Sequence, residues 1–170
     1  GFLSLIDSTE QQIPRPENKE RSKMYFSGKK KKHTVKTQLM VNNKGFIIHK
    51  TEHKKGHRHD YNIYRENRPV APSQIVNVAD LGYLGVEKDY PEQLSAIPCK
   101  KKRNQELSKE EIEYNKIHSK KKRIVIEYTT CRLKKYRIQS DVFRNKLRKY
   151  DRISDIVAGL VNYRILNQQN

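Results

Sequence analysis

The sequence predicts an α/β protein with one mixed β-sheet and flanking helices. Short apolar or alternating runs in the first half of the chain predict strands, whereas apolar residues at helical spacing dominate the second half. A helical segment separates the third predicted strand from the fourth, which favours parallel pairing of the fourth strand with the first. The length of 170 residues suits a single domain, 1–170, with one core.

Three strands are predicted first. Phe2–Ile6 is a continuous apolar run typical of a buried strand, and Asp7 is expected at or near its C-terminal end. His33–Val41 alternates apolar and polar residues, Asn42–Gly45 reads as a turn, and Phe46–Lys50 returns. This pattern predicts a β-hairpin.

A helix and two further strands follow. Asp60 is expected to open a helix through Arg65. Gln74–Ala79 predicts a second buried strand, which ends at Asp80. Ala96–Cys99 predicts a short edge strand, because its proline lacks the N–H that a central strand would use.

Two polar stretches, 11–32 and 100–118, are expected to be surface loops or inserts. The first contains two prolines and a lysine run. The second begins with a basic cluster and gains helical propensity from Gln105, where Ser108 and Glu111 could form a capping box.

A helix is predicted from an N-cap at Ser119 to Ser140, because no proline or glycine interrupts this run. Its apolar stripe consists of Val125, Thr129, Leu133 and Tyr136.

A different face of the same helix carries Arg123, Glu127 and Lys134, at positions i, i+4 and i+11. Taken alone, Arg123 and Glu127 read as an ordinary exposed ion pair.

A final amphipathic helix is predicted over Ser154–Leu166, with Ile156, Leu160 and Val161 facing inward.

The charge of the chain points to a polyanionic partner. Lys and Arg number 37 against 19 Asp and Glu, which gives a net charge of +18. Nucleic acid is the partner that such an excess most often indicates. An anionic membrane surface is the weaker alternative, because no helix has an extended apolar face flanked only by cations.

The sequence contains neither a transmembrane run nor a signal peptide. Cys99 and Cys131 lack a metal-binding spacing and are expected to be free thiols in a reducing compartment, which favours the cytoplasm. The start at Gly1, directly before an apolar strand, predicts a fragment truncated at its N-terminus.

Asp7 and Asp80 each follow an apolar strand. If those strands are parallel neighbours, both carboxylates lie at the edge of the sheet where open α/β sheets bind ligands. Two carboxylates so close repel each other unless a cation lies between them. The alternative for Asp7 is a turn or capping aspartate.

The order of elements resembles the ribonuclease-H-like fold: three antiparallel strands, a helical crossover, then parallel strands with flanking helices. That resemblance implies that acids on the first and fourth strands meet a carboxylate on a later helix.

Five motifs resemble those of bacterial insertion-sequence transposases with a DDE catalytic domain, and eukaryotic Harbinger-type transposases share several of them. The resemblance runs from near residue 1 to about Arg164. The motifs are Ile6-Asp7-Ser-Thr-Glu10, Tyr25-x-x-Gly28-Lys-Lys-Lys-x-His33-Thr-x-Lys36, Gly56-x-x-His59-Asp60, Asp80-x-Gly82-Tyr83 and Arg123-x3-Glu127-x6-Lys134.

The resemblance implies that such a domain cuts and joins DNA at transposon ends with two Mg²⁺ ions, for which Mn²⁺ could substitute. Asp7 would be the first metal-binding acid and Glu127 the third. Asp80 is favoured as the second over Asp60, because a carboxylate at a helix start is readily explained as a cap.

The same resemblance implies contacts with the DNA backbone, association with the nucleoid and a homodimer of the full-length protein. The expected DNA-binding residues are Lys29, Lys30, Lys31, Lys32, His33, Lys36, Arg123 and Lys134.

Two alternative functions account for parts of the same sequence. An inactive transposase remnant that only binds DNA through its basic surface would have almost the same sequence. A basic RNA-binding module is disfavoured, because the alternating strand residues are mostly aliphatic rather than aromatic.

Overall fold

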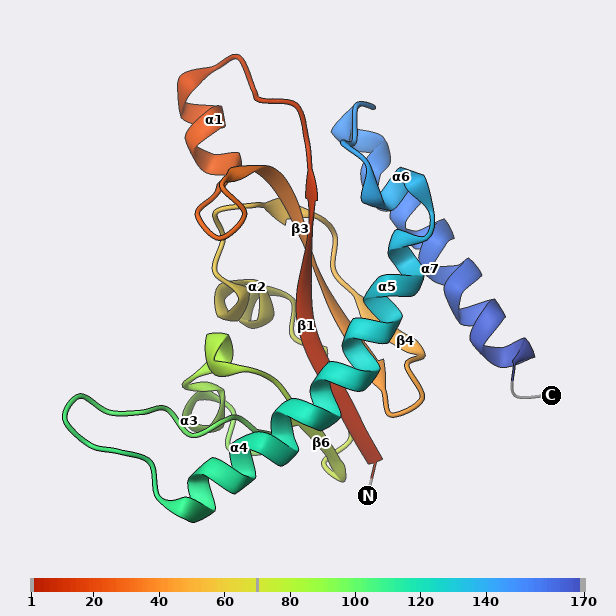
Figure 1. Ribbon diagram of the computed structural model, residues 1–170. Helices are drawn as coiled ribbons and strands as arrows, with labels where there is room; N and C mark the ends of the chain where they lie inside the picture. Colours follow the sequence, from red (N-terminus) through yellow and green to blue (C-terminus); the bar gives the residue numbers. More distant parts are fainter. Residues whose placement is uncertain (1, 70, 169–170) are drawn as a thin grey trace.

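A mixed β-sheet forms the centre of the molecule (Figure 1). The computed structural model describes residues 2–69 and 71–168, and of residues 121–123 it describes the backbone alone. The two long strands, β1 (Phe2–Gln12) and β3 (Lys32–Asn42), pair antiparallel. This pairing forms the spine of the sheet.

Shorter strands extend this pair on both sides. β6 (Ile75–Val78) runs parallel to β1, and β7 (Ser95–Ala96) runs parallel to β6 at the edge. Three short strands pair antiparallel with β3, namely β2 (Phe26–Ser27), β4 (Ile47–Lys50) and β5 (Lys54–Lys55). The predicted mixed sheet, the β3–β4 hairpin and the parallel pairing of β6 with β1 are confirmed.

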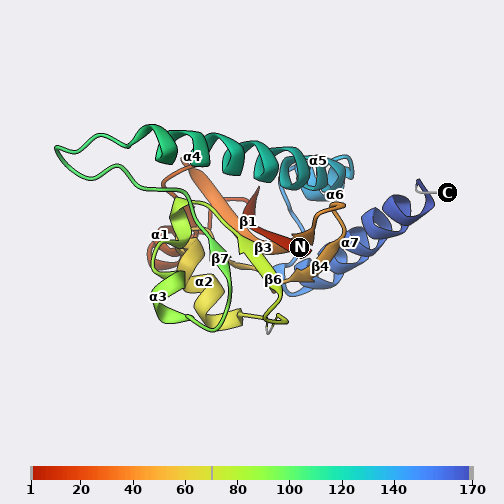
Figure 2. The same cartoon turned by 90° about the horizontal axis from the view of Figure 1, so that it is seen from below.

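Helices flank the sheet on both faces, with α4 and α5 on one side and α2 and α3 on the other (Figure 2). The helices are α1 (Lys19–Tyr25), α2 (Asp60–Asn67), α3 (Val86–Asp89), α4 (Lys109–Lys122), α5 (Tyr128–Lys134), α6 (Arg137–Ser140) and α7 (Tyr150–Asn167). Three short helical turns depart from α-helix geometry. Two are 3₁₀ turns, η1 (Leu81–Tyr83) and η3 (Leu147–Lys149), and one is a π turn, η2 (Arg123–Glu127).

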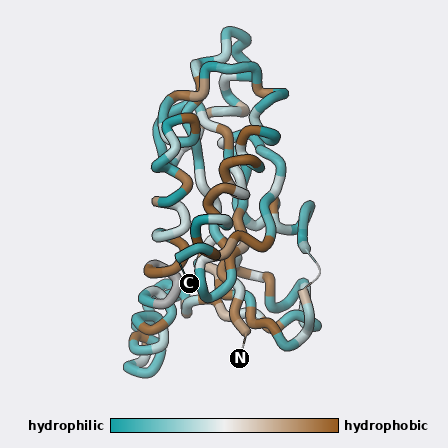
Figure 3. Tube along the Cα trace, turned by 90° about the vertical axis from the view of Figure 1, so that its right-hand side faces the viewer, coloured by the Kyte–Doolittle hydropathy of each residue, from teal (hydrophilic) through white to brown (hydrophobic). Residues whose placement is uncertain are grey.

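Alternation along β1 gives the sheet a core on each face. Leu5 packs with Leu39, Ile126 and Leu133 on the side of α5, whereas Ile6 packs with Tyr83 on the side of α2. Figure 3 shows apolar residues gathered along the middle of the molecule and hydrophilic segments at its periphery. No helix in the described ranges is long and apolar enough to cross a bilayer.

β1 is longer than predicted and places Asp7 in its middle rather than at its end. Its second half stays extended because Gln11 is buried and its amide donates to the carbonyl oxygens of Ile138 and Asp141, at 2.8 and 2.9 Å. The pairing with β6 nevertheless stops at Leu5, so Asp7 lies just past the parallel-paired part of the strand.

The stretch 11–32, expected to be a loop, contains α1 and β2. Asn18 caps α1, because its side-chain oxygen accepts from the backbone N–H of Arg21 at 3.0 Å.

The predicted helix start at Ser119 is wrong, because Ser119 lies inside α4. The helix begins instead after the capping box predicted upstream: Glu111 N–H donates to Ser108 Oγ at 3.1 Å, and Ser108 N–H donates to Glu111 Oε2 at 2.8 Å. The stretch 100–118 is therefore partly helical. α4, η2 and α5 follow one another without a gap, and α6 is a separate short helix.

The last helix, α7, begins earlier than predicted, at Tyr150. Val161 is buried as expected, but Ile156 is 58% exposed and Leu160 44% exposed, so their predicted inward position is wrong. The buried stripe runs through Val157 and Ile165, one residue further along the helix.

Candidate active site

Asp7 lies opposite Leu39 of β3. Residues two apart in a strand share a face, so Asp7 lies on the face of Leu5. The core on that face includes Ile126, and the neighbouring Glu127 is exposed at the end of η2. Thus the turn that carries Glu127 packs onto the same face of β1 that carries Asp7.

Asp80 follows β6 and caps the turn η1. Its Oδ1 accepts from the backbone N–H of Gly82 at 2.9 Å. A side-chain carbon at Gly82 would lie 3.0 Å from that Oδ1 and 3.7 Å from Oδ2 of Asp60. A side chain at Gly82 would therefore crowd the carboxylate of Asp80 and would be in ordinary van der Waals contact with that of Asp60.

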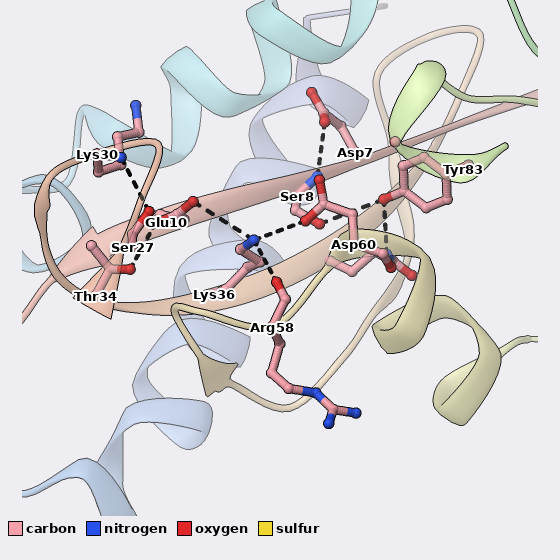
Figure 4. A network of polar contacts seen from close by, with 12 residues as sticks. Asp7, Ser8, Glu10, Ser27, Lys30, Thr34, Lys36, Arg58, Asp60 and Tyr83 are labelled. Atoms are coloured by element: carbon pink, nitrogen blue, oxygen red, sulfur yellow. Dashed lines mark hydrogen bonds and ion pairs between the residues drawn. The ribbon is translucent and has the colours of Figure 1, made fainter. Parts of the chain in front are cut away.

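The hydroxyl of Tyr83 belongs to the network of polar contacts drawn in Figure 4, where it lies beside Ser8. Tyr83 is fully buried, Gln38 Nε2 donates to its hydroxyl oxygen at 2.8 Å, and Ser8 Oγ lies 3.5 Å away. Burial holds the pKa of this phenol well above its usual range, and the carboxylates of Asp60, Asp7 and Asp80 raise it further. These three aspartates therefore all contribute negative potential at one buried hydroxyl.

Asp60 is the first residue of α2 and pairs with a buried lysine. Lys36 Nζ lies 3.0 Å from Asp60 Oδ1 and 3.8 Å from Glu10 Oε1, and it donates to the carbonyl oxygen of Arg58 at 2.7 Å. The exposed fraction is 11% for the Lys36 side chain, 6% for that of Glu10 and 23% for that of Asp60. Thr34 Oγ1 donates to Glu10 Oε2 at 2.7 Å.

The contact between Lys36 and Asp60 is an ion pair rather than a well-aligned hydrogen bond. Asp60 Oδ1 is buried and accepts no hydrogen bond of good geometry within the described ranges. The ammonium of Lys36 is thus held inside the protein, between two carboxylates and a backbone carbonyl, and we do not assign it to the DNA backbone.

Gly56 opens the motif that ends at Asp60, and only glycine fits there. A side-chain carbon on Gly56 would lie 2.1 Å from Thr34 Oγ1 and 2.8 Å from the carbonyl oxygen of Tyr25. The Gly56 N–H donates to the carbonyl oxygen of Thr34 at 3.0 Å. This close approach fixes the segment that leads into Asp60.

A cleft of about 390 Å³ joins Glu10 and Asp60 to the basic loop, whereas Asp7, Asp80 and Glu127 are not among its lining residues. Asp60 and Gly82 line it on one side, and Gly28 and Lys29 line it on the other. The loop follows β2 and is itself structured, because Lys30 N–H donates to Ser27 Oγ at 3.1 Å.

The other predicted DNA-binding residues differ in position. Lys29 to Lys32 are exposed, as is Lys134 at the end of α5. His33 is half-buried, and its Nε2 lies 2.8 Å from Ser22 Oγ, which ties β3 to α1. The side chain of Arg123 lies outside the described part of the structure.

The carboxylates fit a divalent ion in their donor chemistry. Asp7, Asp80 and Glu127 would supply hard oxygen ligands, which Mg²⁺ and Mn²⁺ prefer. The negative field that raises the pKa of Tyr83 would also attract a cation. As the side chains stand, no three His, Cys, Asp or Glu within residues 2–69 and 71–168 lie close enough together to hold a metal ion.

Two polar groups at the site, the Gln38 amide and the Tyr83 hydroxyl, were not predicted. Gln38 Nε2 also donates to the carbonyl oxygen of Asp60, at 3.0 Å, and so ties α2 to Tyr83. In the structure, Gln38 shares a face with Lys36 in a strand that is largely buried, and the sequence alone did not mark it as a site residue.

Residues 6–162, most of the chain, match the family described as the DDE superfamily endonucleases. The chain belongs to this family, and the resemblance inferred from its motifs is confirmed.

A curated relative is the probable transposase for insertion sequence element IS702 of Microchaete diplosiphon. It is 37% identical to this chain over 163 residues, which make up 96% of this chain and 57% of the relative. The chain thus spans little more than half the length of that relative. No solved structure matches the chain.

Proposed function

We propose that the chain is a transposase catalytic domain that cuts and joins DNA at the ends of an insertion sequence by two-metal chemistry. The observation that carries this proposal is the parallel pairing of β1 with β6, which puts Asp7 on one strand and Asp80 directly after the neighbouring strand. Membership of the DDE endonuclease family supports the same reading.

The proposed fold is ribonuclease-H-like. Three sequential strands, β1, β3 and β4, form an antiparallel meander, and β6 then adds parallel to the other side of β1, with β7 beyond it. This arrangement agrees with the layout expected for that fold, in which the first and fourth long strands are neighbours.

Asp7, Asp80 and Glu127 are the proposed metal ligands. When bound, two Mg²⁺ or Mn²⁺ ions would activate the attacking water or 3′-hydroxyl and stabilise the leaving oxygen. The protein orients the first two acids through its backbone: Ser8 N–H donates to Asp7 Oδ1 at 2.9 Å, as Gly82 N–H does to Asp80. Glu127 approaches from the helix that packs on the Asp7 face of the sheet.

Asp80 is preferred over Asp60 as the second acid because of its place in the fold. It follows β6, the parallel neighbour of β1, which is the strand expected for the second acid. Asp60 opens α2 instead, where its carboxylate pairs with the buried ammonium of Lys36 at 3.0 Å.

DNA would lie along the basic side of the cleft. The loop Lys29–Lys32 and Lys134 are exposed and would contact phosphates without reading base sequence. Arg123 and His33 are proposed to assist there. We place this activity on nucleoid DNA in the cytoplasm, with homodimerisation a property of the longer transposase.

A supercoiled-plasmid nicking assay with Mg²⁺ or Mn²⁺ tests the proposal. Removing a metal ligand costs several kcal/mol of transition-state stabilisation, so Asp7→Asn, Asp80→Asn and Glu127→Gln should each lower the rate by ~100-fold or more. Asp60→Asn should leave measurable nicking. Asp141→Asn is a matched control, because its carboxylate forms an exposed pair with Arg137.

The affinity for Mn²⁺, measured by calorimetry, provides a second readout. Asp80→Asn should weaken it more than Asp60→Asn does. If the unaltered chain binds DNA but nicks no faster than Asp7→Asn, the catalytic proposal fails and the chain acts as a DNA-binding remnant. A larger loss with Asp60→Asn than with Asp80→Asn would reverse the assignment of the second acid.

A further inference from the structure

A cationic pocket of about 260 Å³ lies between α5 and α7, outside the acid cluster. Arg132 and Lys135 line it from the end of α5, and Arg164 lines it from α7. No acidic residue is among its lining residues. Within the described part of the chain, none of the three cations forms a salt bridge.

Two of these cations are held in place by aromatic rings. The Arg132 guanidinium lies 4.3 Å from the centroid of the Tyr128 ring, and its Nη2 donates to Gln168 Oε1 at 2.6 Å. The Arg164 guanidinium lies 5.9 Å from the centroid of the Tyr136 ring. A guanidinium fixed in this way loses less conformational entropy when it binds an anion.

A structural explanation accounts for only part of this arrangement. Cations in the last turn of a helix interact favourably with its dipole, and Arg132 and Arg164 each lie in such a turn. That reason applies to each helix separately. It does not explain why two helix ends bring three cations to one open pocket without an acid, since like charges this close repel one another.

We propose that this pocket binds a backbone phosphate of DNA, at a distance from the phosphate that reacts. The proposal rests on the proposed DNA substrate. Guanidinium groups bind phosphate through paired hydrogen bonds, and three cations with no acid nearby favour an anion. Tyr128 directly follows Glu127, and five residues of helix place Arg132 about 8 Å further along the axis.

That separation fits a contact on the same DNA molecule. Five residues also turn Arg132 by about 140° around the helix axis from Glu127, so the pocket would hold a phosphate at the flank of the duplex, away from the one near Glu127. It would therefore position the duplex without taking part in the reaction.

DNA affinity measured against salt concentration tests the proposal. The probe is a fluorescently labelled duplex of arbitrary sequence, and the variant combines Arg132→Gln, Lys135→Gln and Arg164→Gln in the full chain. The pocket is proposed to hold one phosphate, and each lost phosphate contact lowers the slope of log K against log [salt] by about 0.9. We therefore expect the slope to fall by about 0.9 and binding to weaken about tenfold at ~100 mM salt.

A matched control removes the same charge from the opposite face of the sheet. It combines Arg65→Gln, Arg68→Gln and Lys88→Gln on and beside α2 and α3, and its slope should stay within about 0.3 of that of the unaltered chain. Thermal unfolding of both triple variants separates lost binding from lost folding. Equal slopes for the two variants would overturn the proposal.

Inorganic phosphate distinguishes a small-anion site from a DNA site. If phosphate raises the Tm of the unaltered chain but not of the pocket variant, while their DNA affinities agree, the pocket binds a small anion and the proposal is wrong. Plasmid nicking by the Asp7→Asn variant is measured in a separate assay. Loss of nicking in Asp7→Asn with unchanged DNA binding in the pocket variant would refute this site and leave the proposed function standing.

Discussion

Lys36→Met should destabilise the protein mainly through the carboxylates that it leaves behind. The ammonium lies 3.0 Å from Asp60 and 3.8 Å from Glu10. At an effective dielectric constant of about 20, unit charges at these separations interact by roughly 5 and 4 kcal/mol. Water reaches the pair through Asp60, which is 23% exposed, so we expect a net loss of about 3 kcal/mol.

A double-mutant cycle with Asp60→Asn isolates the pair. Urea unfolding of the unaltered chain, both single variants and the double variant should give a coupling free energy of about 2 kcal/mol. Without the ammonium, Asp60 has a buried oxygen and no cation, and Asp60→Asn should then recover part of the lost stability.

Lys50 and Asp155 provide the matched control. Their charged atoms are equally close, at 2.8 Å, and the Lys50 side chain is 8% exposed, but that of Asp155 is 67% exposed. Solvent screening should reduce the coupling in a Lys50→Met, Asp155→Asn cycle to less than about 1 kcal/mol. A Lys36–Asp60 coupling no larger than this control would refute the view that Asp60 is held by a buried counter-ion.

Two further predictions concern stability. Burial raises the pKa of Tyr150 to about 12, so between the ordinary value of 10.0 and that value the unfolded chain loses a proton that the folded chain keeps. Stability should therefore fall as pH rises through this window, and Tyr150→Phe should reduce the slope by up to ~1.4 kcal/mol per pH unit in urea titrations. Identical slopes of unfolding free energy against pH for the unaltered chain and Tyr150→Phe would contradict this prediction. Gly56→Ala places a carbon 2.1 Å from Thr34 Oγ1 and should cost about 3 kcal/mol in thermal unfolding, whereas Gly28→Ala, with nothing within 4 Å, should cost less than ~1 kcal/mol. Equal losses at the two glycines would rule out the steric explanation.

Local patterns predicted the strands well where alternation and turn residues agreed. The β3–β4 hairpin follows from the alternation of Val35–Val41 and the turn at Asn42–Gly45. The second half of β1 was missed because its polar residues pair with distant parts of the chain, as the amide nitrogen of Gln11 does with α6 and the residue after it. The pattern of neighbouring residues in the sequence contains no information about contacts with residues far along the chain.

Helix phase was the other source of error. In α7 two apolar stripes compete, one through Ile156 and Leu160 and one through Val157 and Val161, and only packing against the sheet decides which is buried. Ser119 looked like a cap, but the start at Ser108 had already been fixed by its reciprocal bonds with Glu111.

At the candidate site, the sequence predicted which acids to compare but not what surrounds them. The parallel pairing of β1 with β6 could be predicted, and it brings Asp7 and Asp80 to neighbouring strands. The pairing of Lys36 with Asp60 joins residues 24 positions apart and depends on how α2 packs against β3, so no motif spacing could predict it.

The wide turn η2 makes the rotational setting of α4 depend on chain length. A π turn holds about one residue more than an α turn, and η2 lies between α4 and α5. Thr129 and Leu133 fix α5 in the core, and the side chains of Asn115 and His118 bond α4 to the backbone of Cys99 and Ala96. Deleting one residue from η2 would restore regular α-helix and rotate α4 by about 100° about its axis, which would turn Asn115 and His118 away from those partners. Exchanging one side chain for another would leave that orientation alone.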